Sequence, residues 1–128
     1  MKLKAKGSNA ERELVHMFWD KGWAAIRVAG SGSSQYPSPD VLAGNNLRKL
    51  AVECKASGEL NKYITTEQIE NLAKFSSLFG AEPWVGIRFD RMDWLFLGLE
   101  DLERTESNYR ITPLIAKRKG LLFEELIR

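Results

Sequence analysis

The stretch "YPSPDVLAGNNLRKLAVECKASG", residues 36–58, contains two runs of strand-forming residues separated by a turn. "DVLAG" leads into one strand, "NN" supplies turn residues, and "LRKLAVECK" returns as the second strand, which predicts an antiparallel hairpin over residues 40–55. Because side chains alternate between the faces of a strand, Glu53 and Lys55 share one face, and the hairpin can bring Asp40 beside Glu53. The stretch therefore predicts two converging carboxylates next to one ammonium group.

This cluster has two interpretations. Mg²⁺ binds one or two carboxylates together with water and phosphate oxygens, and Asp40, Glu53 and the backbone carbonyl of Cys54 can supply the protein ligands. Lys55 is placed to hold the attacking water or to offset the charge that builds up on a phosphate during hydrolysis. Alternatively, Glu53 and Lys55 form a solvated ion pair that contributes at most about 1 kcal/mol and has no function. The hairpin alone does not decide between the two.

Hydrophobic periodicity outside the hairpin predicts helices and further strands. Ser8 and Glu11 have the spacing of a capping box for a helix over residues 8–21, and a second helix begins at Thr65 or Thr66 and ends at Gly80. The class is therefore α/β, a mixed sheet flanked by helices. The other expected elements are strands at 23–28, 83–89 and 94–98, a Gly/Ser/Pro loop at 29–39, a short strand near 109–113 and helical turns within 121–128.

Composition sets limits on the kind of protein. A chain of 128 residues with 44% hydrophobic content predicts one domain, residues 1–128. Residues 1–66 carry ten basic and six acidic side chains, against nine and eleven in residues 67–128, so phosphate partners are expected at the first half. Cys54 and His16 are the only cysteine and histidine, which excludes an intrachain disulfide and a His/Cys zinc cluster. With no apolar stretch near the roughly 20 residues of a membrane span, we expect a cytoplasmic protein without a membrane partner. The expected phosphate partners would make it nucleoid-associated.

Two longer patterns resemble a known family. "SPD" at 38–40, twelve intervening residues and "ECK" at 53–55 resemble the PD-(D/E)xK nuclease superfamily. The preceding "KGSNAERELVHMFWDKGWAAIRVAGSGS", residues 6–33, is similar to the N-terminal signature of archaeal-type Holliday junction resolvases, the Hjc/Hje family, and the similarity covers most of residues 6–109. The resemblance implies a restriction-endonuclease-like fold. It also implies a metal-dependent endonuclease that resolves four-way DNA junctions by paired symmetric nicks in homologous recombination and repair.

The resemblance also implies roles for individual residues. Asp40 and Glu53 would bind Mg²⁺, with Mn²⁺ as a potential substitute, and Glu11 would lie near the metal, a role that can coexist with capping by Ser8. Lys55 would orient or activate the water, and Ser31 would donate a hydrogen bond to the junction backbone unless it is an ordinary loop residue. The insert "SSQYPS" before Asp40 leaves the placement of this serine open. The catalytic residues implied in this way are Glu11, Ser31, Asp40, Glu53 and Lys55, and the arginines expected to hold phosphates are Arg12 and Arg27, which otherwise are surface residues.

Two further expectations concern binding surfaces. Residues 1–7, with Lys4 and Lys6, form either a basic arm on the DNA or a disordered solubilising tail. Phe75 and Phe79 match family positions at a subunit interface, and a C₂ dimer would place two active sites on one junction. We therefore expect a homodimer.

Two alternative functions remain. One is a PD-(D/E)xK nuclease acting on another DNA substrate, of repair, flap or restriction type. The other is a non-catalytic module that binds DNA structures. A decayed site would be expected to lose Asp40, Glu53 or Lys55, and all three are present.

Overall fold

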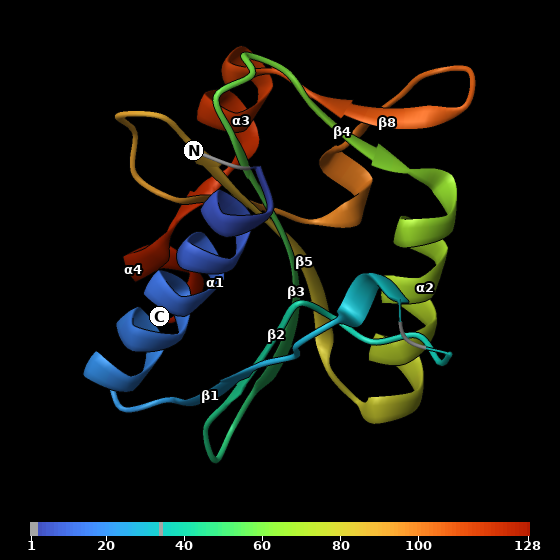
Figure 1. Ribbon diagram of the computed structural model, residues 1–128. Coiled ribbons are helices and arrows are strands. Elements are labelled where there is room, and N and C mark those ends of the chain that lie inside the picture. The colour runs from blue at the N-terminus through green and yellow to red at the C-terminus, as the bar shows by residue number, and fades with distance from the viewer. Residues whose placement is uncertain (1–2, 34) are drawn as a thin grey trace.

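A mixed sheet lies at the centre of the chain in the computed structural model, which describes residues 3–33 and 35–128, apart from the side chains of residues 3–5 and 57 (Figure 1). Strands β3 and β5 run parallel, and every other neighbouring pair in this sheet is antiparallel. The spatial order is β1 (Ala24–Arg27), β2 (Val41–Gly44), β3 (Lys49–Ser57), β5 (Glu82–Phe89), β6 (Leu95–Leu97) and β9 (Leu121–Leu122).

The predicted hairpin is confirmed. Val41 pairs with Val52 across β2 and β3, and the Asn45 side chain accepts hydrogen bonds from two backbone N–H groups in the turn. The backbone of Asp40, one residue before β2, is hydrogen-bonded to both neighbouring segments. Its N–H donates to the Val52 carbonyl (3.1 Å), and its carbonyl accepts from Val28 N (2.8 Å). The backbone that carries this carboxylate is therefore part of the sheet.

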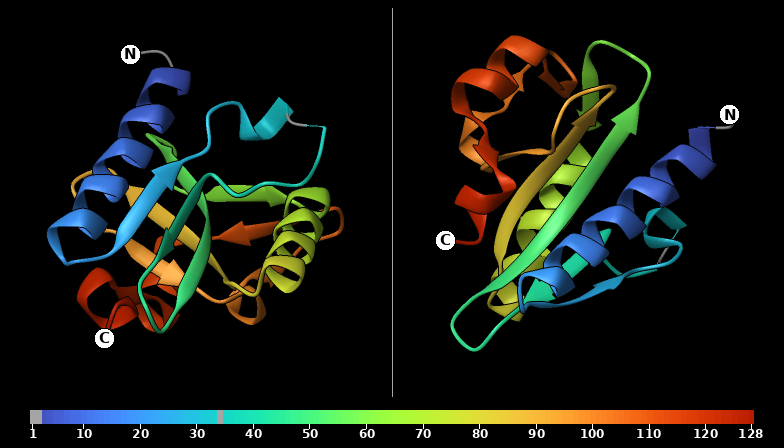
Figure 2. Two further views of the ribbon diagram at one scale, coloured as in Figure 1. Left: turned by 90° about the horizontal axis from the view of Figure 1, so that it is seen from below. Right: turned by 90° about the vertical axis from the view of Figure 1, so that its left-hand side faces the viewer.

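Helices cover both faces of the sheet, as the two views of Figure 2 show. Helix α1 (Leu3–Asp20) buries Leu14 and Phe18 on one face, where α4 (Phe123–Leu126) also packs. Helix α2 (Thr66–Phe79) buries Ile69 and Leu72 on the other face, where α3 (Pro113–Lys119) also packs. The predicted arrangement of a mixed sheet between helices is confirmed.

Helix α1 begins at Leu3, five residues before the predicted start. The capping box of Ser8 and Glu11 is therefore wrong, and so is the placement of Glu11 at a helix N-terminus. Leu, Lys and Ala are good helix formers, so nothing upstream of Ser8 ends the helix, and a single glycine at position 7 is tolerated. Lys4 and Lys6 lie within this helix, whereas Met1 and Lys2 lie outside the described residues.

Helix α2 begins and ends as predicted. The Thr65 hydroxyl accepts from Gln68 N, and the Gln68 side chain accepts from Thr65 N, which together make a capping box. Gly80 ends the helix with a positive φ of 84°, a conformation that favours glycine.

A second, three-stranded sheet was not predicted as a unit. Its order is β4 (Lys62–Thr65), β8 (Asn108–Ile111) and β7 (Glu103–Arg104), and only β8 corresponds to an expected strand. These strands are short, and α3 has a weak pattern of only seven residues, so local periodicity gives little signal. Two 3₁₀ turns complete the chain, at Ser31–Ser33 and Leu99–Asp101. None of the described helices is long and apolar enough to cross a membrane.

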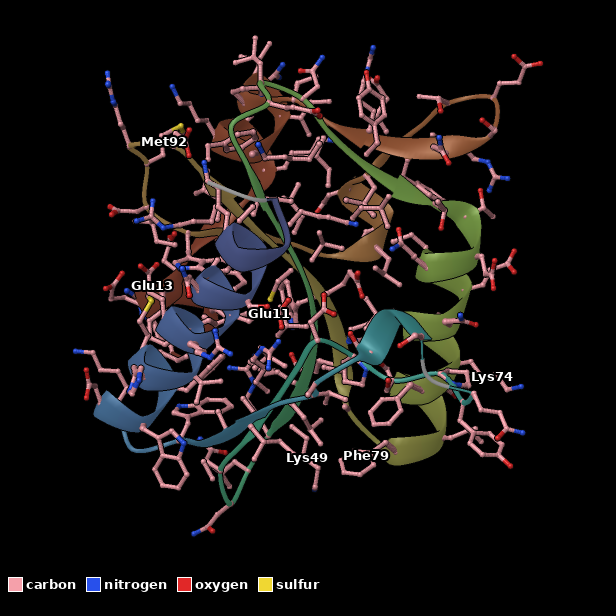
Figure 3. The ribbon with its side chains drawn as sticks, in the orientation of Figure 1. Glu11, Glu13, Lys49, Lys74, Phe79 and Met92 are labelled. Carbon is pink, nitrogen blue, oxygen red and sulfur yellow. The ribbon has the colours of Figure 1, made fainter. Side chains whose placement is uncertain are left out.

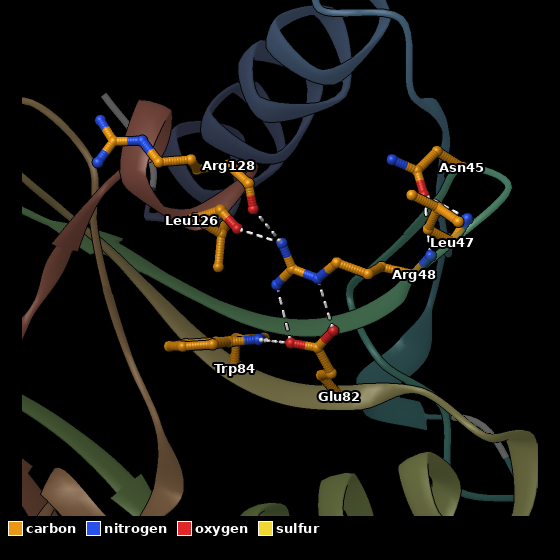
Figure 4. Close-up of polar contacts among 7 residues, drawn as sticks. All are labelled: Asn45, Leu47, Arg48, Glu82, Trp84, Leu126 and Arg128. Carbon is orange, nitrogen blue, oxygen red and sulfur yellow. Dashed lines mark hydrogen bonds and ion pairs between the residues drawn. The ribbon is translucent and has the colours of Figure 1, made fainter.

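Arg48 joins the turn of the hairpin to two distant segments (Figure 4). Its guanidinium donates two hydrogen bonds to the Glu82 carboxylate, at 2.8 and 2.9 Å, and a third to the Leu126 carbonyl at 2.7 Å. Trp84 Nε1 donates to the same carboxylate at 3.2 Å. This group of residues connects the start of β5 and α4 to the hairpin.

Candidate active site

Asp40 is the most tightly held carboxylate of the predicted cluster. Its side chain is buried, with only 8% of the residue exposed. Oδ1 accepts a hydrogen bond from Ser31 Oγ (2.5 Å), and Oδ2 accepts from Cys54 N (2.8 Å). The carboxylate therefore has a fixed orientation between the 3₁₀ turn and β3.

Glu11 reaches the same place from α1. The side chain points from the helix toward the sheet (Figure 3), and Arg27 Nε donates to its Oε1 at 3.0 Å. Arg27 also donates to the Ser8 hydroxyl at 3.0 Å, so one arginine joins β1 to two turns of α1. Burial, followed by the charge of Asp40, raises the pKa of Glu11 despite the nearby arginines.

Glu53 is the carboxylate most affected by its surroundings. Burial, the charge of Asp40 and a side-chain hydrogen bond with Asp40 raise its pKa to about 8, while the charge of Lys55 opposes this shift. Neutral pH therefore favours the protonated form of Glu53, because a second ionised carboxylate in a partly dry site would repel Asp40.

These side chains line one cavity of about 580 Å³ between the hairpin, the 3₁₀ turn and α2. The structure thus brings together all five of the predicted catalytic residues. The predicted members of the lining are Glu11, Ser31, Asp40, Glu53 and Lys55.

The other predicted residues lie outside this cavity. Arg12 is exposed on α1 and donates a long hydrogen bond to Asn9 (3.4 Å). Lys6 forms an ion pair with Asp90 at 2.5 Å, and the side chain of Lys4 lies outside the described set. Phe75 and Phe79 stack on each other at 5.2 Å between ring centroids, with Phe79 47% exposed at the end of α2 (Figure 3).

Sequence reasoning missed the wall that α2 contributes. Thr65, Glu67, Gln68 and Asn71 also line the cavity. Gln68 and Asn71 are three positions apart on a predicted helix, which places them on one face, but the periodicity does not reveal that this face turns toward the hairpin.

The donors present suit a hard divalent cation. Four carboxylates line the cavity against a single lysine, and Glu53 retains a proton that a cation could replace. Among the described side chains, no group of three or more His, Cys, Asp or Glu residues is already arranged to hold a metal ion. Mg²⁺ usually takes one or two carboxylates, so Asp40 and Glu53 fit this requirement, whereas Glu11 is engaged by Arg27.

Comparison with known proteins supplies the family. A family model described as archaeal Holliday junction resolvase (Hjc) matches residues 2–128. The chain belongs to this Hjc family. Enzymes of the family are nucleases, a class that is generally metal-dependent.

Three relatives cover between 76% and 100% of this chain. Crossover junction endodeoxyribonuclease Hjc from Archaeoglobus fulgidus is 43% identical over 130 residues, which cover 96% of both chains. Its counterpart from Sulfolobus acidocaldarius is 37% identical over 130 residues, covering 100% of this chain and 90% of the relative. Crossover junction endodeoxyribonuclease Hje from Saccharolobus solfataricus is 35% identical over 100 residues, covering 76% of this chain and 74% of the relative.

The solved structure of Archaeoglobus fulgidus Hjc, described as a Holliday junction resolvase from an archaeal hyperthermophile, matches with a TM-score of 0.86. It is 40% identical to this chain, and the match covers 94% of both chains. The fold is therefore restriction-endonuclease-like. This confirms the fold class expected from the resemblance and the family expected from residues 6–33.

Proposed function

We propose that this chain is a metal-dependent endonuclease that resolves four-way DNA junctions by paired nicks and acts in homologous recombination and repair. The observation that carries the proposal is the convergence of Asp40, Glu53 and Lys55 in one cavity of an Hjc-family chain. Membership of the family favours junction DNA over other nuclease substrates, and the intact cluster favours catalysis over binding alone.

Asp40 and Glu53 would hold Mg²⁺, or Mn²⁺ in its place. When bound, such an ion lowers the pKa of water and stabilises negative charge on the phosphate. Ser31 and Cys54 N hold the Asp40 carboxylate still, so it does not have to reorganise during the reaction. Lys55 shares a strand face with Glu53 and would donate to the attacking water or to a phosphate oxygen. Glu11 would add negative charge beside this pair.

The arginines have different parts in this proposal. Arg12 is exposed on the same helix as Glu11 and would exchange its long hydrogen bond to Asn9 for one to a backbone phosphate. Arg27 holds Glu11 and Ser8, so its main role would be to orient Glu11. Lys4 and Lys6 would contact the DNA backbone as it enters, and Lys6 would have to exchange Asp90 for a phosphate. The Ser31 hydroxyl donates its only proton to Asp40, so it would have to give up this bond before it could donate to the backbone as expected.

The active protein would be a homodimer built on the end of α2. Exposed apolar side chains gather there: Leu78 is 80% exposed, Phe79 47% and Tyr36 73%, and all three line a cavity with Phe75. Two copies related by a C₂ axis would cover this surface with each other and place two cavities on one junction.

The dimer is tested by analytical ultracentrifugation of wild type and Phe79→Glu. We expect a wild-type dimer and a mainly monomeric variant at micromolar concentration, because burying an unpaired carboxylate at an apolar interface is costly. A wild type that sediments as a monomer would contradict the proposal. Ala73→Glu, which adds the same charge on an exposed part of α2, serves as the control.

The activity is tested by single-turnover cleavage of an end-labelled synthetic four-way junction with Mg²⁺, with Mn²⁺ and with EDTA. We expect symmetric nicks in two strands of like polarity, no products in EDTA, and much slower cutting of linear duplex and flap DNA. Equal cutting of linear duplex would instead indicate a nuclease with another substrate, and binding without cutting in either metal would indicate a non-catalytic module.

A further inference from the structure

The wall that α2 contributes to the cavity has hydrogen-bond donors that other residues do not use. Gln68 and Asn71 are partly buried, lie three positions apart on α2 and line the same cavity as the carboxylates. Among the described residues, the Asn71 carboxamide makes no hydrogen bond, and Asn71 lines this cavity. Ser38 Oγ, in the loop that closes the cavity, is buried and also lacks a partner within the described part of the chain. This lining therefore offers polar groups that a bound molecule can contact.

The capping box fixes which end of the Gln68 side chain is free. The Gln68 carbonyl oxygen accepts from Thr65 N at 3.0 Å, and a backbone N–H can only be matched by the oxygen of the carboxamide. The free end is therefore the NH₂ group, which has two donors and no competing acceptor. The backbone N–H of Gln68 donates to Thr65 Oγ1 at 3.0 Å. The two bonds together fix the position of the Gln68 side chain at the N-terminus of α2.

The two carboxamides of this wall, which lie on α2 together with the Glu67 carboxylate, are neutral donors that suit a phosphate. Four carboxylates already line the cavity, so a DNA phosphate entering it meets repulsion that Lys55 alone does not offset. A carboxamide is neutral and can donate hydrogen bonds to a phosphodiester oxygen. A metal ion held by Asp40 and Glu53 would contact a different oxygen of the same phosphate.

We propose that Gln68 and Asn71 position the cleaved strand by donating hydrogen bonds to non-bridging oxygens of its phosphodiester backbone. This inference rests on the proposed endonuclease function and adds a substrate-facing wall to it. Both are positioning residues: they place the scissile phosphate against the carboxylates and Lys55 and transfer no proton.

The chain offers substitutions that separate positioning from folding. Gln68→Glu keeps an acceptor for Thr65 N, because glutamate is the other common residue at this place in a capping box, and it removes the donor. Asn71→Ala removes the second carboxamide from a helix that tolerates alanine well. Ala73→Glu is the matched control: it adds the same charge as Gln68→Glu, on an exposed part of α2 that lines none of the cavities described.

Single-turnover cleavage at saturating protein, junction affinity in EDTA and thermal unfolding are measured for all four proteins. We expect Gln68→Glu and Asn71→Ala to cut about 10- to 100-fold more slowly than wild type, as for loss of a hydrogen bond to a charged group. Gln68→Glu should also bind the junction about 10-fold more weakly, with a melting temperature near that of the wild type, whereas Ala73→Glu should match the wild type throughout. Rates and affinities of Gln68→Glu and Asn71→Ala equal to those of Ala73→Glu would overturn the inference.

Stereospecific sulfur substitution at the scissile phosphate tests the contact itself. Sulfur accepts hydrogen bonds poorly, so the diastereomer with sulfur facing α2 should slow the wild type, and this slowing should largely disappear in Asn71→Ala. If both diastereomers slow Asn71→Ala as much as wild type, no such contact exists. A wild type that binds junctions without cutting them refutes the endonuclease, while the affinity of Gln68→Glu still decides whether α2 contacts the DNA.

Discussion

Two glutamates along the same pair of strands have opposite environments. Glu82, where β5 begins, accepts three hydrogen bonds from Arg48 and Trp84, and the bond from Arg48 lowers its pKa. Glu53, farther along the neighbouring β3, lies beside a second carboxylate, and burial raises its pKa to about 8. Glu82 thus stabilises the fold as an anion, whereas an ionised Glu53 destabilises it. The difference indicates that Glu53, whose ionised form is unfavourable in the folded chain, serves to bind a ligand.

The largest effect is expected from Asp40→Asn. The amide keeps the size of the side chain but removes the charge that would bind the metal, so junction cleavage should fall by about 10²- to 10³-fold or more. Junction binding in EDTA should remain near wild type, because the exposed basic side chains are unchanged. Single-turnover kinetics and gel shifts measure the two quantities, and loss of binding together with cleavage would contradict the assignment.

The next effect is the pH dependence of stability in EDTA. The pKa of Glu53 is raised in the folded state, so wild-type stability should be greatest below the ordinary value of 4.5, fall as the pH rises toward about 8 and level off above it. Glu53→Gln removes this titration, and at pH 9 it should unfold with a free energy higher by about 2–5 kcal/mol.

Urea unfolding of Glu53→Gln and wild type from pH 5 to pH 9 measures this difference. Mg²⁺ at pH 8 should stabilise wild type and not Glu53→Gln, because a ligand stabilises only the state that binds it. An equal stability gap at pH 5 and pH 9 would show that Glu53 is not protonated in the folded state.

The smallest of these effects is expected from Arg48→Met. Loss of a partly exposed bidentate pair and of the bond to Leu126 should lower the free energy of unfolding by about 1–3 kcal/mol. Glu82 would then lose the partner that lowers its pKa, so its contribution above pH 4.5 should disappear. Cleavage by the folded variant should stay within about twofold of wild type, since Arg48 lies outside the cavity. A tenfold loss of activity would show that the contact between Arg48 and Glu82 affects the cavity around Glu53.

Local patterns predicted the parts of the fold that depend on neighbouring residues. The alternation in "LRKLAVECK" and the turn at "NN" gave the hairpin, and Thr65 and Gly80 gave the ends of α2. The start of α1 was missed because Ser8 has the chemistry of a cap, yet its hydroxyl accepts from Arg27, which is 19 positions away. The small sheet of β4, β8 and β7 was missed because its pairing joins residues far apart in the chain.

In the candidate site too, the residues predicted from sequence are those placed by local structure. Asp40, Glu53 and Lys55 are brought together by one hairpin, so strand geometry alone gave their neighbourhood. Glu11 and Ser31 needed the resemblance, because nothing local relates a helix and a loop to that hairpin. Gln68 and Asn71 needed the structure, since only the packing of α2 against the sheet turns their face toward the cavity.

The contact between Arg48 and Leu126 also bears on how the chain is made. The two residues are 78 positions apart, so a ribosome must add 78 residues after Arg48 before the carbonyl of Leu126 exists to accept its hydrogen bond. At ordinary rates of synthesis this interval lasts about 4–16 s, far longer than a hairpin needs to form. The hairpin that carries Asp40 and Glu53 can therefore form before the contact from Arg48 to Leu126 stabilises it.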